Sequence, residues 1–203
     1  EAFAFSGSLD VSSSSIYNMS GIEYFKGMNS LDCRNNKITS LNLSSNSNIL
    51  RLNCSKNKLH SLNLENCADL LTIDCNYNHL TDIDLSFNLM LDDLSCQNNK
   101  LSDLDLSVNT NLQRLDCSSN KIITLNLSNN SNLLALNCTN NELLKLNIAN
   151  NNNFNILSSN FDATNNNLNC IQVDDADYST QNWSSQIDIS TYFSMNCTAL
   201  GGQ

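Results

Sequence analysis

Apolar and polar positions alternate along most of this chain in a pattern that returns every 21 residues between Leu31 and Ile148. Each unit contains two short alternating stretches, for example at residues 52–54 and 62–64. Alternation with a period of two predicts short β-strands that each have one apolar face. Because a fixed repeat of this length is typical of a solenoid, we expect successive coils to stack about 4.8 Å apart and to bury those faces together.

Six cysteines mark the repeat most clearly. Each falls 21 residues after the last, at the inward position of the first strand of its unit: Cys33, Cys54, Cys75, Cys96, Cys117 and Cys138. A free cysteine behaves as a small apolar side chain in a protein core. Side chains stacked in register run parallel, which keeps their Cβ atoms further apart than a disulfide prefers. We therefore expect a column of buried thiols through the interior.

Asparagine occupies two further repeating positions, each at the turn that follows a strand. The first row is Asn36, Asn57, Asn78, Asn99, Asn120 and Asn141, and the second is Asn46, Asn88, Asn109, Asn130 and Asn151. An inward amide offers both a donor and an acceptor to backbone groups that a turn leaves unpaired. Cys67 stands in the second row where an asparagine would fall, and we expect this replacement to cost about 1 kcal/mol.

Together these positions form an L-x-x-L-x-C-x-x-N-x-L unit that alternates with an x-x-L-x-L-x-x-N unit. The pattern resembles the 21-residue class of the leucine-rich repeat superfamily, and the resemblance covers roughly residues 9–168. It implies an all-β-rich, right-handed solenoid with short parallel strands on two faces and little helix. The 203 residues have room for about seven to eight coils. The resemblance further implies a secreted or surface protein of bacteria that binds a partner rather than catalysing a reaction.

The limits of the repeat divide the chain into four segments. Residues 1–30 form an N-terminal segment with a first, atypical coil, and residues 31–151 form the regular repeats. Residues 152–168 match the pattern only after an insertion of four residues, so we expect a distorted last coil there. Residues 169–203 leave the pattern and are expected to form a C-terminal cap.

Within this cap we expect a strand at residues 170–173, a loop from Asp174 to Trp183, and packing of Trp183 against the end of the core. Cys170 and Cys197 lie outside the cysteine column and frame the cap. We interpret them as a disulfide, which places the protein in an oxidising compartment. Cys67 is then left as a free thiol.

At the other end of the chain, alternating residues bring Phe3 and Phe5 near the first coil. The ends of a solenoid expose apolar core and need a cap. Either these phenylalanines cover that end, or further chain precedes it.

Charge narrows the choice of partner. The chain carries 20 acidic and 10 basic residues, for a net charge of -10. This balance argues against nucleic acid and against anionic lipid surfaces, because both attract basic proteins. No apolar run approaches the roughly 18 residues of a membrane span. A protein or a neutral glycan is the expected partner.

Acidic residues concentrate at the outward positions of the strands. The candidates for ligand or interface contact are Asp74, Asp82, Asp84, Asp93, Asp103, Asp105 and Asp116. Asp82, Asp84, Asp103 and Asp105 should form a two-by-two grid on the second sheet, about 5 Å apart across coils, which we call the acidic grid. Like charges opposite each other destabilise a sheet. The grid therefore suggests either a Ca2+ ion held by hard oxygen ligands or a solvated, screened acidic face. No other cofactor is expected.

Two turn residues beside the acidic grid are apolar. Phe87 and Val108 lie one coil apart at a position that other units fill with Ser or Asn, and Tyr77 and Met90 are near them in sequence. A cluster of exposed apolar side chains can mark an interface. Two roles are open: a binding surface that includes Tyr77, Phe87 and Val108, or packing between coils.

These observations favour an extracellular or cell-surface binding or adhesion module that holds a protein or a glycan on a rigid solenoid face. The alternative is a structural subunit of an extracellular fibre that self-assembles by end-to-end or lateral packing, and a third is an accessory domain of an enzyme. Catalysis needs a nucleophile, a base and an oxyanion donor that converge. The repeats bring no such set to one outward position, and His60 and His79 fall in variable turns where we expect them to be solvated.

Overall fold

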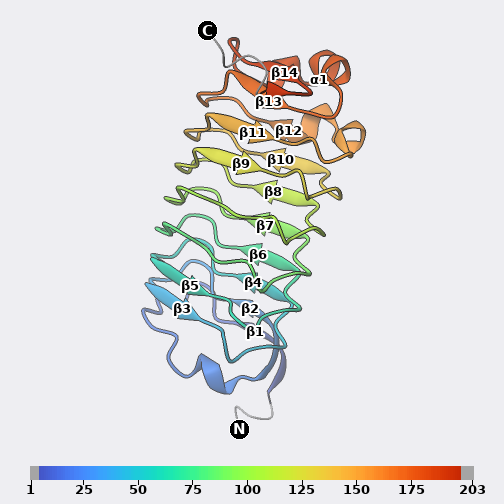
Figure 1. The fold of residues 1–203 in the computed structure, drawn as a ribbon. Coiled ribbons are helices and arrows are strands. Elements are labelled where there is room, and N and C mark those ends of the chain that lie inside the picture. Colours follow the sequence, from blue (N-terminus) through green and yellow to red (C-terminus); the bar gives the residue numbers. More distant parts are fainter. Residues whose placement is uncertain (1–4, 198–203) are drawn as a thin grey trace.

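The computed structural model describes residues 5–197, which wind into a solenoid of stacked coils (Figure 1). Eight parallel strands form one continuous sheet along the solenoid, which we call the main sheet. In spatial order they are β1 (Ser6–Asp10), β2 (Gly27–Asp32), β4 (Arg51–Asn53), β6 (Thr72–Asp74), β7 (Asp93–Ser95), β8 (Arg114–Asp116), β10 (Ala135–Asn137) and β12 (Phe161–Asp162). The predicted β-rich coil, with short parallel strands and little helix, is confirmed.

The second face of the solenoid carries two shorter sheets with a break between them. Nearer the N-terminus, β3 (Ser40–Asn42) pairs with β5 (Ser61–Asn63). Toward the C-terminus lies a four-stranded sheet, which we call the C-terminal sheet: β9 (Thr124–Asn126), β11 (Lys145–Asn147), β13 (Cys170–Gln172) and β14 (Tyr192–Ser194).

The expectation of one strand per coil on this second face is wrong in the two middle coils. Residues 82–84 and 103–105 form no strand. These two segments carry the four carboxylates of the acidic grid, and like charges placed opposite each other oppose strand pairing.

Stacking in register places equivalent side chains on top of one another. Leu52 of β4 pairs with Leu31 of β2 on one side and with Ile73 of β6 on the other. The six cysteines of the repeat are all 0% exposed and unpaired, so the predicted column of buried thiols is confirmed. Burial raises the pKa of Cys33 and Cys75 to about 12, which keeps these thiols protonated and unreactive.

The first row of asparagines uses both ends of its amide, as predicted. The Oδ1 atom of Asn57 accepts a hydrogen bond from the Ile38 N–H of the preceding coil at 3.0 Å. Its Nδ2 group donates to the carbonyls of Cys33 and Cys54, at 2.9 and 3.1 Å. Each side chain of this kind closes its own turn and ties it to the coil before.

The second row behaves differently. Asn88, Asn109 and Asn130 donate through Nδ2 to carbonyls of the preceding coil, but within residues 5–197 their buried Oδ1 atoms have no hydrogen-bond partner. The predicted last member of the row is wrong. Asn151 is exposed with φ of 63°, and Asn150 donates to the Asn130 carbonyl at 3.0 Å instead. The turn shifts by one residue here because the inserted residues begin directly after it.

Cys67 fills the second-row position of its coil as a free, buried thiol, as predicted. Its Sγ lies 3.3 Å from the Leu43 carbonyl, where an asparagine of this row would place its Nδ2 group. Because the asparagines of this row leave Oδ1 unpaired, replacing one by cysteine removes only the hydrogen bonds that its Nδ2 group would donate. The cost of about 1 kcal/mol predicted for Cys67 is therefore an upper estimate.

The N-terminal end is closed by a turn and by aromatic packing. A 3₁₀ turn at Ile22–Tyr24 lies between β1 and β2. Phe5 packs edge to face on Phe25, with ring centroids 5.4 Å apart. A side chain at Gly27 would collide with the Phe5 carbonyl, so glycine permits this close approach. Phe3 lies outside the described residues.

In the C-terminal cap the predicted strand is confirmed as β13, whereas the predicted loop is wrong. Two 3₁₀ turns, at Asn153–Asn155 and Ser158–Asn160, form the predicted distortion of the last coil. The stretch expected to be a loop contains helix α1 (Ala176–Trp183), followed by a 3₁₀ turn at Ser184–Gln186. The helix begins where the Asp175 carboxylate accepts a hydrogen bond from the Tyr178 N–H at 2.9 Å, which is an N-cap contact.

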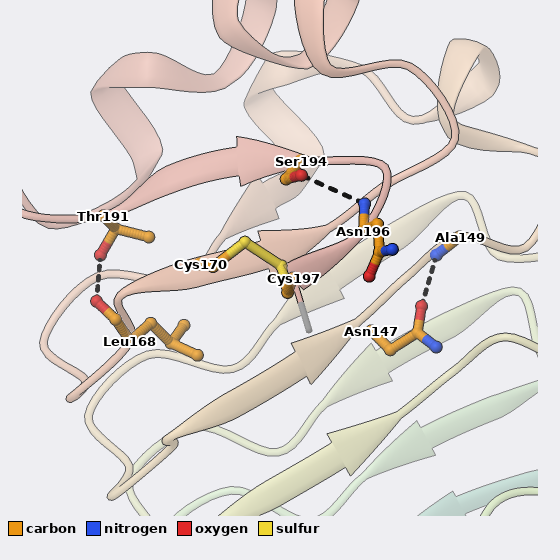
Figure 2. Close-up of a disulfide and its surroundings, with 8 residues drawn as sticks. All are labelled: Asn147, Ala149, Leu168, Cys170, Thr191, Ser194, Asn196 and Cys197. Carbon is orange, nitrogen blue, oxygen red and sulfur yellow. Dashed lines mark hydrogen bonds between the residues drawn. A yellow bond between two sulfur atoms is a disulfide. The ribbon is translucent and has the colours of Figure 1, made fainter. Parts of the chain in front are cut away.

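Trp183 covers the end of the core, as predicted. It is fully buried, stacks on Phe161 with ring centroids 4.6 Å apart, and donates from its indole N–H to the Ile156 carbonyl at 3.3 Å. Cys170 and Cys197 form the predicted disulfide (Figure 2). End-to-end stacking of chains at this end would therefore have to displace the cap.

Candidate functional site

Three hollows lie along the outer face of the main sheet and overlap to form one trough. From the N-terminal end their volumes are about 530, 390 and 520 Å³. The first and second share Asn53 and Asp74, and the second and third share Asp93 and Ser95. This main-sheet trough is therefore continuous from the early coils to Asp162 in the last one.

Four of the predicted site residues border this trough. Asp74 and Tyr77 line its first hollow, and Asp93 and Asp116 line its third. Burial raises the pKa of the Asp74 carboxyl above its ordinary value. The Asp93 carboxylate instead forms an ion pair with Arg114, at 2.8 Å. The acids of the trough thus have different environments, although the sequence presents them as equivalent.

Acids at the outward residue that ends a main-sheet strand, such as Asp116 of β8, also have a structural role that sequence reasoning missed. The Oδ1 atom of Asp116 accepts hydrogen bonds from the N–H and the hydroxyl of Ser118, at 3.0 and 2.7 Å. Asn53 makes the same pair of contacts with Ser55, at 3.1 and 2.7 Å. Aspartate and asparagine both offer this acceptor oxygen, so they interchange along the sheet. An acid at this position is by itself no evidence of a ligand.

Basic residues line the trough as well, although the repeat pattern did not single them out. Arg51 and Arg114 are the outward residues that begin β4 and β8, two positions before Asn53 and Asp116. Both line hollows of the trough, and Arg34 lies at its N-terminal end. The alternation pattern could have identified these positions, since it sends them to the same face as Asp74 and Asp116. The trough therefore carries charges of both signs.

The acidic grid does not converge on a point. Asp84 and Asp105 each accept a hydrogen bond from the N–H two residues later, at 2.9 Å in both cases. Hydrogen bonds from Ser86 hold the pKa of Asp84 below its ordinary value. Within residues 5–197, no three His, Cys, Asp or Glu side chains gather closely enough to hold a metal ion. The geometry therefore lends no support to a calcium site at the grid.

The predicted apolar set divides between two turns. Phe87 and Val108 are 44% and 45% exposed, and Leu89 and Met90 beside them are 50% and 49% exposed. About half of each side chain is thus in solvent, which packing between coils does not explain. Tyr77 does not join them, because it follows a main-sheet strand whereas Phe87 follows a segment of the second face.

The free cysteines of the described chain are not accessible for catalysis. All seven free cysteines are buried, and burial raises the pKa of Cys67 to about 11. His60 and His79 lie against each other with ring centroids 5.3 Å apart.

In the part of the chain that the structure describes, no helix is long and apolar enough to cross a membrane.

No model of a known protein family matches this chain, and no curated protein matches it. Solved structures do. The functional domain of InlJ from Listeria monocytogenes, described as including a cysteine ladder, is 33% identical with a TM-score of 0.64, over 82% of this chain and 43% of that one. Internalin C2 from the same organism is 21% identical with a TM-score of 0.67, over 92% of this chain and 80% of that one.

A leucine-rich repeat protein of Leptospira interrogans is 21% identical with a TM-score of 0.63, over 88% of this chain and 47% of that one. This chain therefore spans less than half of the InlJ and Leptospira chains. At 21% identity, the likeness to internalin C2 and to the Leptospira protein concerns the fold alone. The InlJ structure is similar in sequence as well, and the cysteine ladder it is described as including corresponds to the column of cysteines at residues 33–138 of this chain.

Proposed function

The chain belongs to the leucine-rich repeat superfamily, and from this premise we propose that it is an extracellular adhesion module that binds a protein partner in the main-sheet trough. The observation that carries the proposal is the overlap of three hollows into one trough along all but the first strand of an eight-stranded sheet. An elongated, continuous surface of this kind suits a macromolecule better than a single small ligand.

Rigidity supports a binding role. The first-row asparagines fix the turn after each main-sheet strand, as Asn57 does with contacts to Cys33 and Cys54. Outward side chains such as Asn53 and Asp116 are held in turn by hydrogen bonds to the residues that follow them. A surface that is already ordered loses little conformational entropy when it binds.

The chemistry of the trough favours a protein partner. Its acids are interspersed with Arg51 and Arg114, and the remaining lining is divided between hydroxyl or amide residues and apolar residues of the strands. Complementary charges of both signs set the register and orientation of a protein–protein contact. A chain with a net charge of -10 would favour partners with basic surfaces.

The disulfide between Cys170 and Cys197 supports an extracellular location, since such bonds persist in oxidising compartments. The likeness to a domain of a Listeria protein adds a bacterial surface or secreted protein as the proposed setting. Assembly into a fibre is the less favoured alternative, because α1 and Trp183 cover one end of the stack. Sedimentation at high protein concentration separates the two: a monomer is expected.

Blocking the trough tests the proposal. The change Ser95→Tyr places a large side chain at the point shared by two hollows, where the Ser95 hydroxyl makes no hydrogen bond within residues 5–197. The change Ser61→Tyr is the matched control, because Ser61 is an exposed, outward strand residue on the second face. The purified variants are assayed against a panel of extracellular proteins and for adhesion to cells.

We expect Ser95→Tyr to weaken binding of the recognised protein by at least about tenfold, which corresponds to roughly 1.4 kcal/mol. Ser61→Tyr should bind as the unmodified chain does, and both variants should keep its melting temperature. Loss of binding with Ser61→Tyr alone would place the site on the second face. Absence of any specific protein partner or cell adhesion would remove the proposed function.

A further inference from the structure

A fourth hollow lies away from the main-sheet trough, on the outer face of the C-terminal sheet. Its volume is about 590 Å³, within the range of about 300 to 1,000 Å³ that is typical of small-ligand sites. Outward residues of β9, β11 and β13 form its floor, and the disulfide between Cys170 and Cys197 borders one end. Figure 2 shows this disulfide with Asn147 on a neighbouring strand.

Three amide side chains stand in a row on the floor of this hollow. Asn147 pairs in register with Asn126 on one side and with Gln172 on the other. Adjacent strands bring such side chains to a spacing of about 4.8 Å. The row therefore presents one amide per coil along the axis of the solenoid.

The donor groups of this row are free. The Oδ1 atoms of Asn126 and Asn147 accept hydrogen bonds from the N–H groups of Ser128 and Ala149, at 3.2 and 3.0 Å, which fixes both amides. Within the described residues, their Nδ2 groups have no partner, and the Gln172 side chain has none at either end. The hollow thus offers oriented N–H donors and one adaptable amide.

Apolar surface stands beside the amides. Tyr192 is 39% exposed and Leu144 is 58% exposed, and both line the hollow. An exposed tyrosine offers a flat apolar ring together with a polar hydroxyl. Of the described residues that line the hollow, none is acidic and only Lys145 is basic. That composition is unusual in a chain with a net charge of -10.

We propose that this hollow, the amide site, binds a neutral oligosaccharide. Sugar hydroxyls both donate and accept, so they can satisfy the Nδ2 groups and both ends of the Gln172 amide. The apolar face of a sugar ring can lie on Tyr192 or Leu144. A purely apolar ligand would bury the amide donors without partners, at roughly 1 to 3 kcal/mol each. A polyanion would bind poorly, because Lys145 is the one basic residue among the described lining of the hollow and the chain as a whole is acidic.

The site goes beyond the trough and its protein partner, because it lies on another face and takes another class of ligand. The spacing of the three amide side chains favours an oligosaccharide over a monosaccharide. The amide row repeats at the strand spacing, so successive sugar units of an extended oligosaccharide can each meet an equivalent amide.

The test uses the whole chain on an array of neutral oligosaccharides, including cello-, malto-, xylo- and manno-oligosaccharides, with calorimetry on the ligand that binds best. Chondroitin sulfate and polygalacturonate serve as anionic probes. The variant Tyr192→Ala removes the exposed ring, and Gln172→Ala removes the free amide. Tyr77→Ala is the matched control, because Tyr77 is a similarly exposed tyrosine in the trough.

We expect Tyr192→Ala to weaken neutral oligosaccharide binding by about tenfold and Gln172→Ala by about fivefold, while Tyr77→Ala changes it less than about twofold. Gln172→Ala keeps the test decisive if Tyr192→Ala loosens the cap. No binding to any neutral oligosaccharide, preference for the anionic probes, or equal effects of Tyr192→Ala and Tyr77→Ala would overturn the proposal.

The two sites are separable. Ser95→Tyr should leave oligosaccharide binding intact, and Tyr192→Ala should leave protein binding intact. A negative result in the protein-binding panel therefore does not contradict the proposed amide site. A negative result on the oligosaccharide array does not contradict the proposed protein-binding trough.

Discussion

The two rows of asparagine should differ sharply in what they contribute to stability, although the sequence presents them as equivalent. We compare Asn120→Ala in the first row with Asn109→Ala in the second. Both side chains are buried, at 9% and 0% exposure, and both sit in regular middle coils. The same atoms are deleted in each case, so the difference in unfolding free energy isolates their hydrogen bonds.

Removing Asn120 leaves a buried donor unpaired. Its Oδ1 atom accepts from the Leu101 N–H at 2.9 Å, and its Nδ2 group donates to the Cys96 and Cys117 carbonyls, both at 3.1 Å. An unpaired buried N–H costs roughly 1 to 3 kcal/mol, and each lost donor bond costs about 1 kcal/mol. The expected loss of unfolding free energy is therefore about 3 to 5 kcal/mol.

Removing the Asn109 side chain leaves no buried backbone group without a hydrogen-bond partner. Its Nδ2 group donates to the Leu85 and Asn88 carbonyls, at 3.1 and 2.9 Å, but both carbonyls also accept a backbone N–H, from Asn88 and Leu91. Its Oδ1 atom is buried with no partner in the described chain, and truncation relieves that penalty of roughly 1 to 3 kcal/mol. Two lost donor bonds, at about 1 kcal/mol each, largely cancel this gain, so the net loss is about 1 kcal/mol or less.

Equilibrium unfolding in urea, followed by circular dichroism, measures both variants against the unmodified chain. The comparison uses the midpoint and requires an unchanged dependence on urea concentration, since repeat proteins can unfold in parts. We expect Asn120→Ala to be less stable than Asn109→Ala by at least about 2 kcal/mol. Equal losses would refute the reasoning and would show that the second-row Oδ1 atoms are satisfied, for example by buried water.

The remaining predictions concern the cap, one buried acid and calcium. Replacing both Cys170 and Cys197 by alanine, which opens a 27-residue separation, should lower the unfolding free energy by about 3.5 kcal/mol, as measured by urea titration against reduced and oxidised protein. Burial raises the folded-state pKa of Asp74, so its ionisation destabilises the fold above that pKa. Asp74→Asn keeps an acceptor for the Asn76 N–H and should raise the melting temperature at pH 7, with the advantage fading as the pH falls toward 4; an advantage constant in pH would contradict the assignment. Millimolar Ca2+ should shift the melting temperature no more than equal Mg2+ does, because no three carboxylates converge among the described residues; a shift specific to calcium would restore the calcium hypothesis.

Features that depend on strict repetition were predictable from the sequence. The cysteine column and the first asparagine row follow from a period of 21 residues, since equal spacing places equal residues at equal positions in each coil. The disulfide was predictable because Cys170 and Cys197 lie outside that column and at the two ends of the cap. The N-cap at Asp175 was visible in principle, because an acid precedes the start of α1. The helix was missed because it has little apolar periodicity: only Ser179 and Trp183 are buried.

Other features depend on energies that spacing does not reveal. The alternation pattern treats residues 82–84 as a strand like residues 61–63, yet only the second range pairs. The sequence identified the repulsion within the acidic grid and left two ways to relieve it, a bound Ca2+ ion or screening by solvent. In the structure the strands do not form there. The amide site was likewise hidden, because Tyr192 and Cys197 belong to the cap and lie beside β13 only once the chain has folded back.

The break in the second face has a consequence for how the two proposed sites relate. In a solenoid each coil contacts only its neighbours, so a local change reaches distant coils only through the stack between them. The main sheet is continuous through all eight strands, whereas the second face is interrupted between β5 and β9. Strain introduced at the amide site would cross fewer strand–strand hydrogen bonds along the second face than along the main sheet. The first asparagine row fixes each turn of the main sheet to the coil before it, which holds the trough rigid. Ligands at the two sites should accordingly bind with little effect on each other.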